Sequence, residues 1–254
     1  MKRVIKIGGR AQSSPDLARV VAAAWESEPG SFCIVHGGGD RISEFQRRMG
    51  LEPSFVDGRR VTTREDMEIV RMVLSGFVNK DLASKFIAAG VPAVGISGED
   101  GETITAALLD EKLGRVGKPV AVKTGVIDIL LDNGFLPVIS PLALEDGNPG
   151  EVLNVNGDDA AAAIAIALGA SELLLIADVD GVLDDRQAVI STLDQGDTAE
   201  LVQKGIVSRG MKAKLEAGFA ALSGGVNRVR VASLDGVANK SSGTLLTFAQ
   251  SLTA

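Results

Sequence analysis

Short apolar runs alternate with stretches of helical periodicity along most of the chain. The apolar runs have the length of buried strands, and the stretches between them place apolar residues three to four positions apart. The predicted strands are 4–7, 32–35, 91–96, 136–140, 173–177 and 228–232, and the predicted helices are 16–28, 40–49, 128–133, 158–168 and 212–222. Residues 64–89 carry two further helical stretches, separated at Gly76. This alternation predicts an α/β fold with a mainly parallel central sheet that helices cover on both faces.

The chain has 254 residues, which is enough for one large core or for two lobes. No repeat, low-complexity tract or long linker interrupts it. We therefore expect a single domain over residues 1–254, with a compact lobe boundary near Ala170 that gives lobes 1–170 and 171–254.

Charge and composition narrow the classes of partner. The net charge is −7, and an acidic surface repels nucleic acid and anionic lipid, so neither is expected as a partner. No stretch approaches the roughly 20 apolar residues of a membrane span. The single cysteine, Cys33, lies in an apolar run, where we expect a buried structural thiol. With no internal disulfide and no signal-peptide pattern, the sequence favours a cytoplasmic protein.

Three glycine clusters follow predicted strands, at 8–9, 37–39 and 98–101. Glycines let the backbone approach an anion closely, and a following helix adds the positive end of its dipole. The phosphate loop G-x-x-x-x-G-K-[ST], a clean G-x-G-x-x-G after a strand and the protein kinase motifs are all absent from the sequence. The clusters therefore predict an anion site of another type.

Four charged residues stand where local structure gives them little support. Lys6 ends an apolar strand, where a lysine is costly to bury, and Lys214 opens a helix whose dipole disfavours a cation. Asp158 and Asp178 stand at a helix start and at a strand end. Each has a structural alternative, such as a helix cap for Asp158, a turn for Asp178 and a solvated face for Lys214. The residues alone leave these alternatives open.

Ten short segments follow, in order and in spacing, the pattern of a known group of enzymes. They are 6–9, 35–39, 56–62, 78–80, 95–101, 113–117, 154–158, 177–183, 210–214 and 243–245. Through them the chain resembles the acetylglutamate kinase branch of the amino acid kinase family from about residue 3 to residue 246. One such segment would be unspecific, but ten in register are very specific.

The resemblance implies an open αβα sandwich of the amino acid kinase fold, in which lobe 1–170 binds the amino acid and forms the dimer and lobe 171–254 binds ATP. It implies ATP-dependent phosphorylation of the side-chain carboxylate of N-acetyl-L-glutamate to N-acetyl-L-glutamyl 5-phosphate, in arginine biosynthesis. Mg²⁺ would be held mainly by the nucleotide phosphates rather than by a protein metal site. The acceptor carboxylate is already ionised at neutral pH, so no general base is needed and His36, the only histidine, receives no catalytic role.

Carried onto the matching positions, the resemblance implies three sets of site residues. Lys6 and Lys214 would hold the transferred phosphoryl group from opposite sides, and Asp158 would orient both lysines. The acceptor set includes a clamp for the α-carboxylate and a contact to the amide, and consists of Gly38, Gly39, Arg60, Asn154 and Asn156. The phosphate and nucleotide set consists of Gly8, Gly9, Asp178, Val179, Asp180, Gly181, Val182, Leu183, Ile206, Val207 and Ser208.

Three departures from the family pattern bear on specificity and packing. Thr63 stands where the family commonly has Asp, which could change how the acyl group is read. The stretch 118–124 is unlike the usual hairpin and strand. The segment 235–243 is too short for a helix usual in the family, which could alter the edge of the nucleotide lobe.

Alternative functions stay open at this stage. The acceptor could be another N-acylated glutamate or aminoadipate, or a glutamate or aminoadipate masked by a small acidic carrier protein, in lysine or arginine biosynthesis. A carrier protein would need a basic docking surface, and the chain has a local cluster of arginines at 47, 48, 59, 60 and 64. A non-catalytic metabolite sensor is disfavoured because Lys6, Asp158 and Lys214 are all retained. A nucleoside monophosphate kinase or an aspartokinase is disfavoured by segments 58–62 and 154–156.

The resemblance also carries an expectation about assembly. Arginine-inhibited members have an extra N-terminal helix that links dimers into a ring, whereas here the first predicted strand begins near residue 3. We therefore expect a homodimer without that inhibition, built on the helical stretch 64–89.

Overall fold

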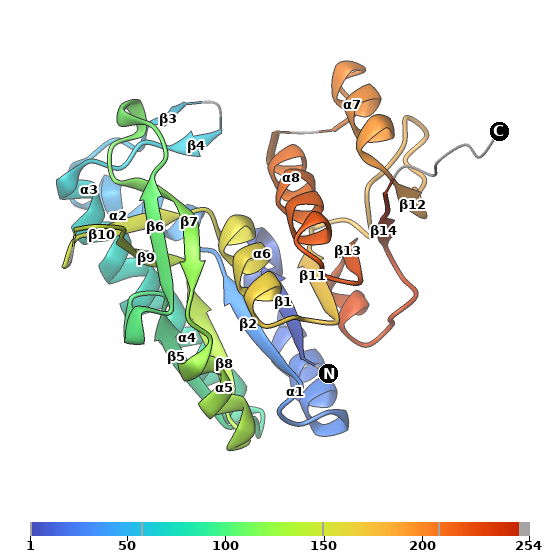
Figure 1. The fold of residues 1–254 in the computed structure, drawn as a ribbon, viewed down its shortest axis with the longest axis horizontal. Coiled ribbons are helices and arrows are strands. Elements are labelled where there is room, and N and C mark those ends of the chain that lie inside the picture. Colours follow the sequence, from blue (N-terminus) through green and yellow to red (C-terminus); the bar gives the residue numbers. More distant parts are fainter. Residues whose placement is uncertain (1, 57, 149, 208, 249–254) are drawn as a thin grey trace.

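The computed structural model describes residues 2–56, 58–148, 150–207 and 209–248. Its centre is an eight-stranded sheet with the order β12-β14-β13-β11-β1-β2-β8-β5 (Figure 1). These strands are β1 (Arg3–Ile7), β2 (Phe32–His36), β5 (Ala93–Ser97), β8 (Leu136–Ser140), β11 (Glu172–Ile176), β12 (Thr192–Leu193), β13 (Val229–Ala232) and β14 (Thr244–Leu246). Neighbouring strands pair in parallel except for β13 and β14. The predicted α/β fold with a mainly parallel sheet is confirmed.

Helices cover both faces of this sheet. Right-handed crossovers that run in opposite directions along a sheet place their helices on opposite faces. Accordingly, α1 (Leu17–Ser27) and α4 (Asn79–Ala88) contact each other on one face, and α5 (Gly125–Asp132), α6 (Gly157–Ala167) and α8 (Arg209–Ser223) cover the other. Both α6 and α8 begin at the edge where the parallel strands end, which is where α/β sheets form their ligand sites (Figure 1).

The alanine-rich sequence of α6 explains how closely this helix packs. Ala160, Ala161 and Ala165 are fully buried, and their small side chains let α6 approach β1, β11 and α8 together. Asn156 caps the helix, because its Oδ1 accepts hydrogen bonds from the backbone N–H groups of the second and third helical residues at 2.8 and 3.3 Å. The helix-cap alternative for Asp158 is therefore wrong, and its carboxylate is free to serve another partner.

A small closed barrel stands beside the sheet, in the order β10-β7-β6-β9. Its strands are β6 (Ile104–Leu108), β7 (Val116–Val122), β9 (Leu142–Glu145) and β10 (Val152–Val155). The expectation that 118–124 departs from a hairpin and strand is wrong, because β7 runs through this stretch and pairs with β6. The register shifts between Thr105 and Ala106, opposite Pro119, and such a bulge accommodates a residue that has no N–H for the ladder.

One helical rod runs without a break from residue 64 to residue 88. It consists of α3 (Arg64–Arg71), a π-helical stretch (Met72–Val78) and α4. The predicted separation at Gly76 is wrong, because the chain widens its hydrogen-bonding pattern there instead of ending the helix. Thr63 caps α3 in a reciprocal capping box with Asp66, so this departure from the family pattern serves the local structure.

The remaining elements lie at the periphery. They are α2 (Gly39–Arg48), a two-stranded hairpin of β3 (Phe55–Val56) and β4 (Arg59–Arg60), and α7 (Gln195–Gln203). The short segment before Gly243 holds a single 3₁₀ turn (Leu234–Val237). The buried Arg230 guanidinium supports it by donating to the carbonyl oxygens of residues 236, 239 and 242 at 2.7–3.2 Å.

Across the described ranges, no helix combines the length and the apolar character that crossing a bilayer requires. Ala170, where we placed the lobe boundary, is buried between α6 and β11. Strands from both predicted lobes share the central sheet, since β1 pairs directly with β11.

Candidate active site

Lys6, Asp158 and Lys214 meet where the strands of the central sheet end. Lys6 lies on β1, between Val35 of β2 and Leu175 of β11. Its Nζ is 2.9 Å from Oδ1 of Asp158, and Nζ of Lys214 is also 2.9 Å from that same oxygen. The three side chains are only 9–10% exposed. The structure thus brings together the three residues predicted to be catalytic, from three distant segments of the chain.

Burial and charge set the protonation of this cluster. Burial alone would raise the pKa of the Asp158 carboxyl, but the two ammonium groups outweigh it and hold this pKa at about 2. Burial lowers the pKa of Lys214 to about 8, and the positive charge of Lys6 acts in the same direction. With both lysines protonated and Asp158 ionised, the cluster carries a net charge of +1. It is therefore suited to receive an anionic group.

Glycines at positions 8 and 157 make room for the Lys6 side chain. A Cβ on Gly8 would lie 2.5 Å from Lys6 Nζ, and a Cβ on Gly157 would lie 3.2 Å from Lys6 Cε. Gly9 has a φ of +55°, which L-residues rarely adopt, and a Cβ there would lie 3.4 Å from the Asp178 carboxylate oxygens. A larger residue at these positions would displace the groups that face the cluster.

A cavity of about 430 Å³ opens over the cluster between the ends of β1 and β11 and the start of α8. Its lining combines both lysines with several predicted phosphate-binding residues: Lys6, Gly8, Gly9, Asp158, Asp178, Val179 and Lys214. Gly210 and Met211, at the start of α8, complete the same wall. This cavity places the end of β1, the end of β11 and the start of α8 around one space.

The predicted nucleotide turn continues from Asp178 through Leu183. Residues 178–180 are exposed, whereas Gly181 and Val182 are buried against β14. The N–H of Val182 donates to Thr244 Oγ1 at 2.8 Å, and that hydroxyl donates to the Ile190 carbonyl at 2.6 Å. One threonine hydroxyl of β14 therefore fixes both arms of the turn, and Leu183 then pairs with Val189.

The other predicted nucleotide residues lie between α7 and α8. Ile206 and Val207 are half-buried, and their N–H groups donate to the Leu201 carbonyl at 3.0 and 3.4 Å. Ser208 lies outside the described residues. This segment precedes α8 directly, but its backbone hydrogen bonds are made to α7.

A second cavity, of about 210 Å³, lies on the other side of Lys6. All five predicted acceptor-binding residues line it: Gly38, Gly39, Arg60, Asn154 and Asn156. Ile42, Leu74 and Val116 add an apolar wall. Gly157 lines the cavity too, and because a Cβ there would lie 3.2 Å from Lys6 Cε, this end of the cavity lies next to the lysine cluster.

Arg60 is held in this cavity by neutral oxygens. Its guanidinium donates to the Gln46 amide oxygen, to Ser43 Oγ at 2.7 Å and to the Gly39 carbonyl at 2.8 Å. Burial lowers the pKa of Arg60, and the nearby carboxylates of residues 66 and 40 act against that shift. A buried cation in fixed orientation with neutral hydrogen-bond partners is a favourable site for an incoming carboxylate.

The two amides of the acceptor set are oriented differently. Asn154 donates from Nδ2 to Thr62 Oγ1 at 3.1 Å, which fixes the plane of its amide at the cavity wall. Asn156 uses its oxygen to cap α6. Asn156 therefore joins the wall of the second cavity to α6, the helix that carries Asp158.

His36 and Cys33 are both fully buried in β2. Burial lowers the pKa of His36 to about 4, so its ring is neutral. Nδ1 of that ring donates to the Gly37 carbonyl at 2.8 Å, and Nε2 accepts from the Asn79 amide at 3.1 Å. Burial raises the pKa of the Cys33 thiol to about 12. Both residues therefore have structural surroundings, in line with the sequence-based expectation.

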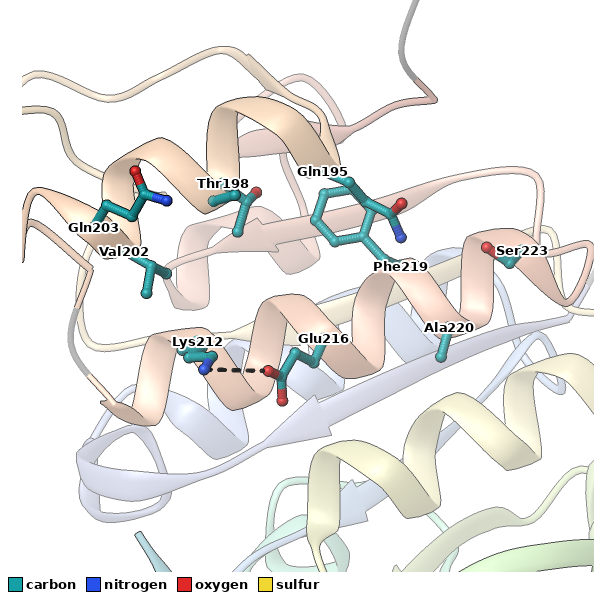
Figure 2. Close-up of a pocket in the computed structure, with 10 residues that line it drawn as sticks. Gln195, Thr198, Val202, Gln203, Lys212, Glu216, Phe219, Ala220 and Ser223 are labelled. Atoms are coloured by element: carbon teal, nitrogen blue, oxygen red, sulfur yellow. Dashed lines mark ion pairs between the residues drawn. The ribbon is translucent and has the colours of Figure 1, made fainter. Parts of the chain in front are cut away.

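A larger hollow lies away from the cluster, between α7 and α8 (Figure 2). It has a volume of about 580 Å³, and apolar side chains such as Val202 and Phe219 face it. Lys212 and Glu216, 3.8 Å apart, lie along its α8 side. Its lining shares no residue with the predicted catalytic, acceptor or nucleotide sets.

Within the described part of the chain, no group of three or more His, Cys, Asp or Glu side chains is arranged to hold a metal ion. The expectation that nucleotide phosphates hold the metal stays a prediction. The structure adds residues that the predicted sets lack: Gly157, Gly210, Met211 and Arg59. All four stand inside motif segments, Arg59 in 56–62, Gly157 in 154–158, and Gly210 and Met211 in 210–214, so the motifs themselves were the signal that could have found them.

Comparison with known proteins places these features in a family. The sequence profile of the amino acid kinase family matches residues 1–233. The acetylglutamate kinase of Methanopyrus kandleri is 42% identical over 245 residues, covering 92% of this chain and 96% of that protein. The acetylglutamate kinase of Rubrobacter xylanophilus is also 42% identical, covering 88% and 85% of the two chains.

A solved structure gives the same result for the fold. The crystal structure of smu.665 from Streptococcus mutans UA159 superposes with a TM-score of 0.84 at 30% identity, covering 96% of this chain and 98% of the other. The profile match and these relatives span nearly the whole chain, including both cavities and the lysine cluster. The chain therefore belongs to the amino acid kinase family, and within it is a relative of the acetylglutamate kinases.

Proposed function

We propose that this protein is an acetylglutamate kinase, which transfers the γ-phosphoryl group of ATP to the side-chain carboxylate of N-acetyl-L-glutamate in arginine biosynthesis. The observation that carries the proposal is the buried cluster of Lys6, Asp158 and Lys214 between two cavities. The relatives of about 40% identity that bear the name acetylglutamate kinase support the choice of reaction.

Phosphoryl transfer to a carboxylate requires two anionic groups to approach each other. Catalysis then depends on positioning and on neutralising the charge that spreads over the transferred oxygens. Lys6 and Lys214 would supply two cations on either side of that group, while Asp158 keeps both ammonium groups in place before the substrates arrive. The ionised acceptor attacks without losing a proton, so the absence of a basic histidine in the described site is no obstacle.

The acceptor would occupy the cavity of about 210 Å³. In it, Arg60 would bind the α-carboxylate through a two-pronged contact, and Asn154 would bind the N-acyl amide. The backbone N–H groups of Gly38 and Gly39 would complete the contacts. The cavity is smaller than the pockets typical of drug-sized ligands, which suits a small acylated amino acid.

ATP would occupy the cavity of about 430 Å³ on the other side of the cluster. Gly8 and Gly9 would offer backbone N–H groups to the phosphates, and residues 178–183 and 206–208 would contact the nucleoside. When bound, Mg²⁺ would screen the phosphate charge, and we propose that the phosphates themselves supply most of its ligands. Asp178, whose carboxylate faces Gly9 in the wall of this cavity, would assist them.

We further propose a two-lobed cytoplasmic homodimer, with lobe 1–170 binding the acceptor and lobe 171–254 binding the nucleotide. The continuous helical rod 64–88 supports the choice of dimer surface, because Met72 and Phe77 on it are 48% and 43% exposed. Exposed large apolar side chains on one element favour burial against a second copy.

A carrier-masked acceptor receives less support from the arginine cluster than its composition suggests. Arg48 pairs with Glu44 at 2.5 Å, Arg59 pairs with Asp159 at 3.1 Å, and Arg64 pairs with Glu151 at 3.2 Å. Because acidic neighbours neutralise three of the five arginines, an acidic carrier would find a weakened basic surface there.

The proposal is tested by measuring ATP turnover with Mg²⁺ and several acceptors. N-acetyl-L-glutamate is compared with N-succinyl-L-glutamate, L-glutamate, L-aspartate and uridine monophosphate, and acyl phosphate is trapped with hydroxylamine. We expect hydroxamate with N-acetyl-L-glutamate alone. Product from aspartate or uridine monophosphate would reassign the acceptor within the family, and turnover with none of them would favour a carrier-bound acceptor or a sensor.

A further inference from the structure

The β3–β4 hairpin covers the acceptor cavity but has little support of its own. Each strand is only two residues long, and a hairpin of that size is marginal in water. Phe55 and Val56 are 53% and 42% exposed, so burial of apolar surface contributes little to its position. Nevertheless Phe55, Arg59 and Arg60 all line the acceptor cavity. The hairpin must therefore be held by contacts to the elements on either side.

The first of these contacts runs from β4 to α2. It is made by Arg60, through its hydrogen bonds to Gln46, Ser43 and the Gly39 carbonyl. The Arg60 guanidinium also lies 4.8 Å from the centre of the Phe55 ring, which ties the two strands of the hairpin together. One side of the hairpin is thus fixed by the residue that would bind the acceptor.

The second contact runs from β4 to α6. Arg59 Nη1 donates to Asp159 Oδ2 at 3.1 Å, and the two side chains are 30% and 21% exposed. Asp159 lies in the first turn of α6, directly after Asp158. The ion pair therefore links the neighbour of Arg60, which is proposed to bind the acceptor, with the neighbour of Asp158, which holds both lysines of the cluster.

This ion pair is better protected than others on the surface. Burial raises the pKa of Asp159, and the charge and hydrogen bond of Arg59 act against that rise. Without Arg59, the partly desolvated Asp159 carboxylate would lose this cation while the Asp158 carboxylate stays nearby. By contrast, the Arg64–Glu151 pair involves an arginine side chain that is 75% exposed, where such pairs contribute little.

We propose that Arg59 and Asp159 position the β3–β4 hairpin over the acceptor cavity, and that this ion pair determines the affinity for the acceptor without contacting the transferred phosphoryl group. The inference rests on the proposed acceptor role of this cavity. Arg59 is a positioning residue in this scheme, because it acts through Arg60 and the hairpin. We assign the effect to the acceptor side because Arg59 lines the acceptor cavity and neither Arg59 nor Asp159 lines the cavity assigned to ATP, although Arg59 also borders a third cavity that reaches Asp158 and Gly210.

The test is a double-mutant cycle of Arg59→Met, Asp159→Asn and the combined variant. We expect each single substitution to raise KM for N-acetyl-L-glutamate by about fivefold to twentyfold, as for coupled neighbouring residues, with KM for ATP changing less than about twofold. The combined variant should be no worse than the more impaired single variant. Arg59→Lys should recover part of the loss, and Arg64→Met serves as the control for removing a surface arginine.

A second readout keeps the test independent of the catalytic assay. Without any substrate, backbone hydrogen exchange in β3 and β4 should quicken in all three cycle variants and stay unchanged in Arg64→Met. The inference would be overturned if the losses of the two single variants simply added in the combined variant, or if KM rose equally for N-acetyl-L-glutamate and for ATP. Unchanged hydrogen exchange in β3 and β4 would overturn it too. If the wild type does not phosphorylate N-acetyl-L-glutamate, the proposed function fails, and the exchange experiment still decides whether the ion pair holds the hairpin.

Discussion

The proposed acceptor side and the proposed nucleotide side of the lysine cluster are built from different parts of the chain. On the acceptor side, the orienting contacts are made by side chains, such as those of Arg60 to Ser43 and of Asn154 to Thr62. On the nucleotide side, the wall is mostly backbone, with Gly8 and Gly9 close to charged groups and Val182 tied through its N–H to Thr244.

This difference corresponds to what each ligand offers for recognition. An acylated amino acid must be told apart from similar metabolites, which requires a charge and an amide at fixed places. Phosphates are the same in every nucleotide, and backbone N–H groups bind them without reading anything further. Substitutions that change side-chain chemistry should therefore affect the acceptor, and substitutions that fill backbone space should affect phosphoryl transfer.

The largest expected effect on the acceptor side comes from Arg60→Lys. A lysine keeps the charge but loses the planar fork, so KM for N-acetyl-L-glutamate should rise about a hundredfold. KM for ATP should stay within about twofold of the wild-type value. Thermal unfolding of the variant serves as the control for the lost contacts to α2. Equal increases in both KM values would contradict the separation of the two sides.

Gly8→Ala should have the next largest effect, and on kcat. The new Cβ would lie 2.5 Å from Lys6 Nζ, so the ammonium must leave its place beside Asp158. We expect kcat to fall about thirtyfold, within the range for a displaced transition-state contact. Gly125→Ala, where a Cβ would meet nothing within 4 Å, is the matched control. A Gly8→Ala variant with wild-type kcat would show that Lys6 need not occupy this position.

The pH profile tests the charge of the cluster. Lys214 has a pKa of about 8 instead of 10.5, so it loses its proton as the pH rises through about 8. The charge that would hold the phosphate disappears with that proton. Above this pH, kcat/KM for ATP in the wild type should therefore fall about tenfold per pH unit, as expected for a required acid in the free enzyme.

Stability provides the control for this profile. Between about pH 8 and 10.5 the unfolded chain binds more protons at Lys214 than the folded one, so this group makes the free energy of unfolding rise with pH. Loss of activity at constant or rising Tm would thus identify titration rather than unfolding. Lys214→Arg, if active, should lack the decline, and a flat wild-type profile to pH 9.5 would contradict the charge assignment.

Thr244→Val should have the smallest effect, confined to the nucleotide side. Valine matches the shape of threonine but removes the hydroxyl that links Val182 to Ile190. KM for ATP should rise about fivefold, the size expected from leaving a buried N–H and carbonyl without this partner. Thr244→Ser should restore most of the loss. A rise in KM for the acceptor instead would break the distinction between the two sides.

The sequence predicts the parts of the fold that have uninterrupted patterns. Fully buried strands such as Phe32–His36 read as continuous apolar runs, and α6 reads as a helix from its alanines. The barrel strands escaped prediction because β7 contains Lys118 and Pro119, which interrupt any alternation. The helix α7 (195–203) was not predicted either, because none of its side chains is buried and no apolar stripe marks it in the sequence.

The site residues, like the elements of the fold, divide into those that the sequence predicts and those that it does not. Lys6, Asp158 and Lys214 stand in motif segments, and the resemblance alone assigns them to one site. The ion pair of Arg59 and Asp159 could not be predicted, because it joins residues 100 positions apart and depends on where a two-residue hairpin lies. Family motifs thus indicate which groups are proposed to surround the transferred phosphoryl, whereas the contacts that hold a hairpin of two-residue strands in place require the structure.

The most direct test of the central claim follows the phosphoryl group itself in the wild type and in Lys6→Ala. With ATP, Mg²⁺ and N-acetyl-L-glutamate, acyl phosphate trapped as hydroxamate should appear at the same rate as ADP in the wild type. Lys6→Ala should lose about a thousandfold in kcat, as for removal of a main transition-state contact. Lys2→Ala, which removes a half-buried lysine that pairs with Asp128, should not lose kcat. ADP released without hydroxamate, or Lys6→Ala with wild-type turnover, would contradict the assignment.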